Sequence, residues 1–196
     1  AELICYDVNG IQIVFGVTEE NELKLFHFSR APFDAENLCR KPDNWWPMEG
    51  MREAQIKESF QLVQVNFSGY NRPYEKHGNK YIVTAPGFML KFDSISEERD
   101  ENGDVLRIVQ KDGVTGAKVE SVMQFYDGLS IARMYNTVTN EGNEDQTLEY
   151  ISSFSYWGIE KEQKEGIPEF ISSDDKMSMV VVHNGWQKEL TVKKYR

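Results

Sequence analysis

The chain has 196 residues, a length that suits one all-β domain. Its 22 Lys and Arg residues against 32 Asp and Glu residues leave a formal charge of −10, so neither nucleic acid nor an anionic membrane surface is expected as a partner. The hydrophobic fraction of 40% is ordinary for a folded chain, and the apolar runs are far shorter than the roughly 20 residues that cross a bilayer. Nothing in these features assigns a compartment, and the localisation stays unknown.

Several stretches within the first ninety residues alternate apolar and polar side chains with the period of β-strands. Asn9-Gly10 has the composition of a two-residue hairpin turn and separates the first two alternating stretches. Strands are predicted over residues 4–6, 11–15, 23–28, 60–67 and 80–84, the last ended by Pro86-Gly87.

The same alternation continues to the end of the sequence. Asp100-Glu101-Asn102-Gly103 is the strongest hairpin signal, and it joins predicted strands at 90–98 and 104–110. Further strands are predicted over 118–126, 129–139, 146–157, 177–183 and 187–195. The pattern therefore predicts an all-β fold, a sandwich of two antiparallel sheets with at least eleven strands.

One long segment, residues 29–59, interrupts the strand pattern. It is polar, contains Pro32, Pro42 and Pro47, and has room for short helical turns over 35–40 and 49–56. Loops of this length in a compact domain are usually functional or disordered. We expect one long aromatic-tipped loop and few short helical turns within a single domain, residues 1–196.

Groups that could carry nucleophilic or metal chemistry are better explained as structural. Ser130 lies in a sequence near a nucleophile elbow, but it begins an alternating strand where the elbow needs a strand, a turn and a helix. His27, His77 and His183 are scattered, so they are interpreted as strand-surface or loop residues and no metal site is predicted. Cys5 and Cys39 are expected to be two thiols, with a disulfide left as the alternative.

Acidic clusters also have plain interpretations. In residues 100–111 the glycine stands fourth rather than sixth, and Lys111 replaces the closing carboxylate of a calcium loop, so a hairpin is favoured. Glu97-Glu98 and Asp174-Asp175 are neighbours, which in a strand point to opposite faces and cannot act on one bond. Asn66-Phe67-Ser68 fits a glycosylation acceptor without other support. No catalytic residue and no cofactor is predicted.

Aromatic residues in the long loop carry the remaining functional signal. Trp45 and Trp46 stand together before Pro47, with Phe33 and Asp34 upstream. Exposed indoles beside carboxylates suit the apolar face and hydroxyl rim of a sugar, or a partner surface. The alternative is that one indole closes an end of the sandwich and anchors the loop. Trp157 and Trp186 stand near strand positions and are expected in the core.

The second half of the sequence resembles the N-terminal domain of family 36 glycoside hydrolases, the α-galactosidases and their relatives. The resemblance runs in order over residues 60–196 and is weaker before them. Its motifs are Gly128-Leu129-Ser130-Ile131-Ala132-Arg133-Met134, Asn136-Thr137-Val138-Thr139-Asn140-Glu141-Gly142, Leu148-Glu149-Tyr150-Ile151-Ser152-Ser153-Phe154 and His183-Asn184-Gly185-Trp186-Gln187-Lys188-Glu189-Leu190. Ser68-Gly69-Tyr70-Asn71-Arg72-Pro73 is similar to the family's Gly-Asp-Phe-Arg-x-Pro turn. Two departures are Lys188, which stands where many members have Gly, and the first sixty residues, which differ most.

The resemblance implies a β-supersandwich that precedes a catalytic (β/α)₈ barrel. In the family both catalytic acids come from the barrel, after a Lys-Trp and after a Gly-Gly-x-Arg stretch, and this chain has neither Lys-Trp-Asp nor Gly-Gly. The sequence opens on Ala1 and ends within the strand-like run 190–196, so we expect a fragment of a longer chain without the barrel.

By analogy with oligomeric family members, loops of this domain approach the sugar site of a neighbouring subunit. Phe33, Asp34, Trp45 and Trp46 are the candidates for carbohydrate or subunit contact, with the indoles walling the site and Asp34 bonding a hydroxyl. The expected function is thus a non-catalytic domain of an α-galactosidase-like enzyme, a homo-oligomer acting on α-galactosides. An autonomous carbohydrate-binding module that stacks sugar on Trp45 and Trp46 is the alternative, and a fragment that is itself a hydrolase is the third reading.

Overall fold

The computed structural model describes residues 2–33, 35, 60–70 and 85–156, together with the backbone of residues 179–185 and 188–195. The chain divides into two compact units. The first contains the described residues up to 156, and the second contains the last two described ranges. The described elements are almost entirely antiparallel strands, which confirms the all-β prediction.

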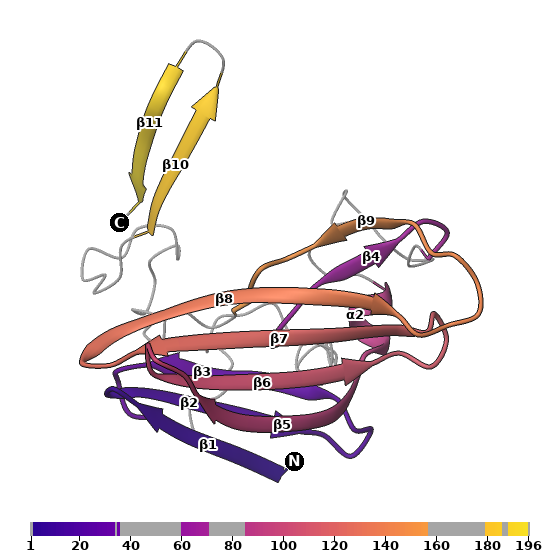
Figure 1. The fold of residues 1–196 in the computed structure, drawn as a ribbon, viewed down its shortest axis with the longest axis horizontal. Coiled ribbons are helices and arrows are strands. Elements are labelled where there is room, and N and C mark those ends of the chain that lie inside the picture. The colour runs from indigo at the N-terminus through magenta and orange to yellow at the C-terminus, as the bar shows by residue number, and fades with distance from the viewer. Residues whose placement is uncertain are drawn as a thin grey trace, which may run out of the picture. The chain divides into compact units, whose positions relative to one another are not determined.

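The first unit contains three antiparallel ladders (Figure 1). One ladder has the order β1-β2-β3, with β1 at Glu2–Val8, β2 at Ile11–Val17 and β3 at Leu23–Ser29. A second pairs β4, Val65–Phe67, with β9, Leu148–Ile151. The third has the order β5-β6-β7-β8, with bounds Lys91–Arg99, Asp104–Lys111, Ala117–Tyr126 and Leu129–Asn140.

Turn residues place the hairpins where the sequence predicts them. Asn9 and Gly10 have φ angles of 53° and 75°, and positive values at both positions define the two-residue turn that suits the twist of a hairpin. At the second predicted hairpin, the Asp100 carboxylate accepts backbone N–H bonds from Asn102 and Gly103 at 2.8 and 3.1 Å. The hairpin that the sequence favoured over a calcium loop is therefore confirmed, and the Asp100 side chain caps its turn.

Two layers enclose the core of the first unit. Side chains from β1, β2 and β3 pack against side chains from β6 and β7, for example Phe15 and Leu25 against Leu106 and Phe125. A smaller cluster packs Val65 and other β4 residues against the Ala117 end of β7, on the other part of the same sheet. The two-sheet sandwich predicted from the sequence is thus formed by the β5–β8 ladder on one side and the other two ladders on the opposite side.

The prediction of continuous strands over 60–67 and 146–157 is wrong in its extent. Phe60 has a φ of 64°, in the left-handed region that strands do not use, and regular pairing begins only at Val65. Isolated backbone bonds still join these stretches: Ser152 and Ser155 donate to the carbonyls of Gln64 and Leu62 at 2.9 and 3.0 Å. The Leu25 N–H donates to the Phe60 carbonyl at 2.7 Å, so the irregular segment bridges β3 and β9 within one layer.

Residues 85–90 differ from the prediction as well. Pro86-Gly87 was expected to end a strand, but these residues belong to the short helix α2, Ala85–Met89. Proline is tolerated in the first turn of a helix, where its missing N–H has no intrahelical acceptor. The predicted strand at 80–84 and the predicted helical turn at 49–56 lie outside the described residues, and so does the turn at 35–40 apart from Ala35, which is a bend.

The described part of the second unit is one antiparallel hairpin, β10 at Met179–Gly185 and β11 at Lys188–Tyr195. Its pairing runs from Met179 opposite Tyr195 to Gly185 opposite Lys188, with a shift of register between His183 and Gly185. Both strands agree with the strands predicted over 177–183 and 187–195. Within the described residues, no helix is both long enough and apolar enough to cross a membrane.

Candidate functional site

The base of the long loop is fixed to the sandwich where the loop leaves β3. The Phe33 N–H donates to the side-chain oxygen of Gln12 on β2 at 2.6 Å, and the Ala31 N–H donates to the Ser29 hydroxyl at 3.0 Å. The half-buried Phe33 ring lies 5.6 Å from the His27 ring, centroid to centroid. Phe33, the first of the four predicted site residues, therefore holds the first residues of the loop in place.

His27 occupies a different environment from the one predicted. The prediction of a strand-surface or loop residue is wrong, because His27 lies on β3 with no exposed area. Its Nε2 lies 2.7 Å from the Ala31 carbonyl, and a carbonyl oxygen only accepts, so Nε2 carries the proton. This bond is a second tie between β3 and the loop, and nothing in the sequence pattern around His27 announces the turn that supplies its acceptor.

The other predicted contact residues lie outside the described residues. These are Asp34, Trp45 and Trp46, and the contact that each makes stays a prediction. Trp157, Cys39, His77 and Asp174-Asp175 are also outside, as are the side chains of His183 and Trp186. Cys5 is exposed on β1 and forms no disulfide within the described part of the chain.

Glu149 joins the two halves of the β4–β9 ladder through its carboxylate. The carboxylate accepts a hydrogen bond from the Asn66 amide at 2.8 Å and another from the Ser68 hydroxyl at 2.9 Å. Asn66 is 2% exposed, so the amide of the potential glycosylation sequence is held inside the protein. Two of the three residues of that sequence thus have a structural role.

Other acidic side chains of the first unit also have defined partners. Arg99 pairs with Asp104 and Asp127, and Arg107 pairs with Glu98 and Glu120. Backbone N–H bonds from Asn102 and Gly103 lower the pKa of Asp100, the first of these bonds being the largest contribution. A general acid needs a raised pKa, so the environment of Asp100 is the opposite of the one a catalytic acid requires.

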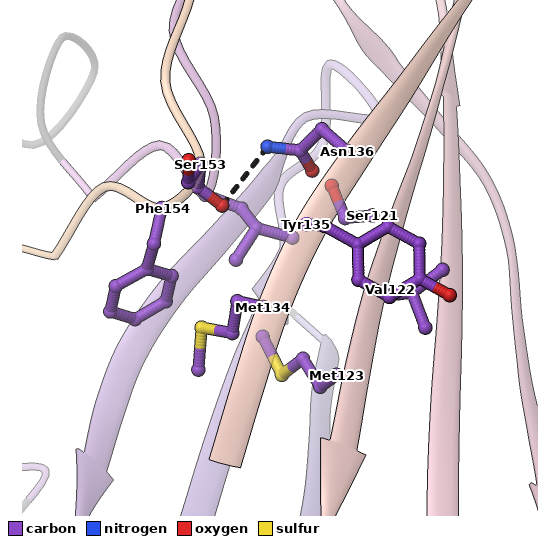
Figure 2. A pocket seen from close by; sticks show the side chains of 9 residues that line it. Ser121, Val122, Met123, Met134, Tyr135, Asn136, Ser153 and Phe154 are labelled. Atoms are coloured by element: carbon purple, nitrogen blue, oxygen red, sulfur yellow. Dashed lines mark hydrogen bonds between the residues drawn. The ribbon is translucent and has the colours of Figure 1, made fainter.

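A small niche lies between β7, β8 and the segment that follows β9 (Figure 2). Met123, Met134 and Phe154 line its apolar side, and Ser121 and Asn136 line its polar side. Its volume of about 10 Å³ has room for one water molecule, whereas small-molecule pockets in proteins measure about 300–1,000 Å³. This niche is too small for a sugar.

Asn136 closes the niche by reaching from β8 to the opposite layer. Its amide nitrogen donates to the carbonyl oxygens of Ser152 and Ser153 at 2.5 and 3.1 Å, the second of which is drawn in Figure 2. Ser121 is 5% exposed, and its hydroxyl has no hydrogen-bond partner among the described residues. Of the two polar side chains of the niche, Asn136 therefore joins the layers, whereas the Ser121 hydroxyl bonds no described residue.

The row of outward-facing side chains on β8 was not recognised from the sequence. Ile131 and Tyr135 are 53% and 41% exposed, and the Arg133 guanidinium between them lies 5.6 Å from the Tyr135 ring centre. The signal was present as the odd-numbered positions of the strand predicted over 129–139, since alternate residues share one face. Ser130 lies at the start of this strand and its hydroxyl donates to the Asn9 carbonyl at 2.9 Å, which agrees with the strand interpretation.

Comparison with known proteins gives one similar structure. No family model matches the chain, and none of the curated proteins matches it. A crystal structure of a GH36 alpha-galactosidase from Geobacillus stearothermophilus, in complex with 1-deoxygalactonojirimycin, is similar with a TM-score of 0.49 and 13% sequence identity. The similarity covers 75% of this chain, which spans 23% of the length of that enzyme. A likeness of this size transfers no residue role. Among the described residues, no group of three or more potential metal ligands is brought together.

Proposed function

We propose that residues 1–196 form a non-catalytic domain of a glycoside hydrolase that resembles the family 36 α-galactosidases. The observation that carries the proposal is the ordered series of sequence motifs from Gly128 to Phe154. These motifs coincide with β8, with β9 and with the segment that follows β9, whose carbonyls accept the hydrogen bonds of Asn136. In this proposal the reaction takes place in another domain of the same enzyme, and the α-galactoside binds there.

The long loop is the part of this domain that contributes to the sugar site. Its base is tied to β2 and β3 through Gln12, His27 and Phe33, so residues further along the loop start from a fixed position. In the proposed homo-oligomer, Asp34, Trp45 and Trp46 contact the substrate or the neighbouring subunit.

The loop proposal is tested by kinetics in an enzyme that contains this chain together with its catalytic domain. Trp46→Ala is expected to raise KM or lower kcat for α-galactoside oligosaccharides, while the assembly state and the unfolding temperature stay unchanged. Val114→Ala is the matched control, because Val114 is an exposed apolar side chain in the turn between β6 and β7, outside the loop and outside β8. Unchanged kinetics in the Trp46 variant, with intact assembly, would show that the loop is only a scaffold.

A carbohydrate-binding module is the second candidate function. Its supporting feature is the adjacent pair Trp45-Trp46, since paired indoles offer a flat apolar surface for a sugar ring. This candidate differs from the first in requiring sugar affinity from the 196-residue chain alone. It also requires that Trp45→Ala and Trp46→Ala each weaken that affinity, whereas Phe33→Leu, at the loop base, weakens it less.

A further inference from the structure

The two edges of the four-stranded sheet have contrasting chemistry. β5, at one edge, has five charged residues among nine: Lys91, Asp93, Glu97, Glu98 and Arg99. β8, at the other edge, has one charged residue, Arg133, among twelve, and neither proline nor glycine. Charged side chains on an edge strand oppose pairing with another chain, and their scarcity favours it. Among the strands that the structure describes, β8 is therefore the edge of this sheet that is suited to adding a strand.

The outward face of β8 has the side chains that protein interfaces use. Ile131 and Tyr135 are half exposed, and Arg133 stacks on Tyr135. The other cations of this face, Arg107, Lys111 and Lys118, each lie within 4 Å of a carboxylate. Arg133 has no such carboxylate among the described residues. Tyr and Arg are the residue types enriched at the energetic centres of interfaces.

We infer that β8 pairs antiparallel with β8 of a second copy of this chain, with Met134 opposite Met134 of the partner subunit. The inference rests on the oligomer of the proposed function and deepens it by naming the surface. In this register Arg133 stands opposite Tyr135 of the partner subunit, and the twofold axis repeats the contact. Ile131 stands opposite Thr137 of the partner subunit, so no like charges face each other.

Neighbouring registers are less favourable. A shift that centres the pairing on Arg133 places two guanidinium groups directly opposite each other, which destabilises a strand pair. A shift that centres it on Tyr135 places Arg133 opposite a threonine and removes both cation–aromatic contacts. A shift by one residue would turn the outward face of one copy toward the inward face of the other. The sequence of β8 thus favours its own copy in one register, and the joined sheet has eight strands.

A charge exchange across the axis tests both the partner and the register. The mass of the 196-residue chain is measured by sedimentation over a range of micromolar concentrations at about 0.15 M salt, where screening limits repulsion between two chains of charge −10. A concentration-dependent dimer is expected. Tyr135→Arg places two arginine pairs opposite each other and is expected to weaken dimerisation about tenfold or more. Adding Arg133→Glu to that variant creates two Glu–Arg pairs and is expected to restore the dimer.

Ser94→Arg is the matched control, since Ser94 is an exposed, outward-facing residue of the other edge strand. It adds the same charge and should leave dimerisation unchanged. Circular dichroism and the unfolding midpoint of each variant verify that the fold is intact. A wild-type chain that stays monomeric, a dimer that tolerates Tyr135→Arg, or a double variant that fails to recover would each overturn the inference.

A disulfide measures the register independently. In a Cys5→Ser, Cys39→Ser background, Met134→Cys should oxidise to a covalent dimer, because directly opposed strand residues have the Cα separation that a disulfide needs. Ser94→Cys in the same background should stay monomeric. Failure of Met134→Cys to crosslink would overturn the register. Neither experiment involves sugar. A negative result would therefore overturn the proposed β8 interface without deciding the kinetic test of the Trp46 loop.

Discussion

The ammonium group of Lys24 lies 3.3 Å from the carboxylate of Glu22, and the two side chains are only 1% and 8% exposed. Lys91, which is partly exposed on β5, reaches the same carboxylate at 3.1 Å. Removal from water lowers the pKa of Lys24, and the neighbouring Glu22 opposes this by raising it. A buried lysine of the core therefore pairs with a glutamate that it shares with a surface lysine, and Glu20 adds a smaller attraction.

The two partners of this ion pair are expected to differ in their effect on stability. Glu22→Gln removes the principal counter-charge of the buried Lys24, and removal of one partner from a buried pair costs up to about 3–5 kcal/mol. Lys24→Met leaves Glu22 paired with Lys91, so its loss of unfolding free energy is smaller. Urea unfolding measures both. Lys91→Met, at an exposed position, is the control and should cost at most about 1 kcal/mol. Equal losses for Glu22→Gln and Lys24→Met would contradict this description.

The pH dependence of the same pair has a definite sign. The pKa of Lys24 in the folded chain lies below its ordinary value of 10.5, so the unfolded state binds more protons between the two values. Stability from this group therefore rises as the pH increases toward 10.5. Tyr6 and Tyr156 act in the opposite direction at higher pH, because burial raises the pKa of both. The difference in unfolding free energy between wild type and Lys24→Met, taken at each pH, removes the contribution of the two tyrosines because both proteins contain them. This difference should shift in favour of wild type as the pH rises. A constant difference would contradict the lowered pKa.

Two glycines with the same backbone angle provide a matched pair of substitutions. Gly10 and Gly116 both have a φ of 75°, so alanine at either position pays the strain of the left-handed region, about 1–2 kcal/mol. Gly10 has open space around its Cβ position, whereas a Cβ at Gly116 would lie 2.5 Å from the backbone of Gly142. Gly116→Ala should therefore lower the free energy of chemical unfolding by about 1–3 kcal/mol more than Gly10→Ala does. Similar losses of unfolding free energy for the two variants would show that the backbone around Gly142 moves away from the new Cβ at little energetic cost.

The niche between the layers gives a second matched pair. Asn136→Ala removes the amide that bonds the carbonyls of Ser152 and Ser153, and is expected to cost about 1–3 kcal/mol. Ser121→Ala removes a buried hydroxyl that no described residue bonds, so its unfolding free energy should stay within about 0.5 kcal/mol of wild type. Both are read from the midpoint and slope of urea unfolding. A larger loss for Ser121→Ala than for Asn136→Ala would reverse the assigned roles.

Much of the fold could be predicted from the sequence because local signals agree with one another. The strands predicted over 104–110, 118–126 and 129–139 lie within one residue of β6, β7 and β8, where the alternation is regular and turn residues bound it. The turn at Asn9-Gly10 was predictable for the same reason, since its residues tolerate the positive φ angles that the turn requires.

Other features depend on contacts between distant residues. The alternation at 60–67 predicts a full strand, but Phe60 takes a left-handed conformation and its carbonyl bonds Leu25 on β3. His27 lies on the buried face of β3 with Leu25, and its ring nitrogen bonds the Ala31 carbonyl, which the loop supplies. Of the candidate site, only Phe33 falls within the described residues, and its partner Gln12 comes from another strand. Local patterns do not contain such pairings.

Calorimetric titration of the 196-residue chain with p-nitrophenyl α-galactoside distinguishes a supporting domain from a binding module and from a hydrolase. A domain that shapes a sugar site only together with its catalytic partner should give no heat beyond dilution up to millimolar substrate. Saturable heat with millimolar or tighter affinity, a free energy of about −4 kcal/mol, would instead indicate an autonomous binding module. Sustained heat with release of p-nitrophenol would show that the chain itself catalyses hydrolysis, and either result would contradict the proposed role.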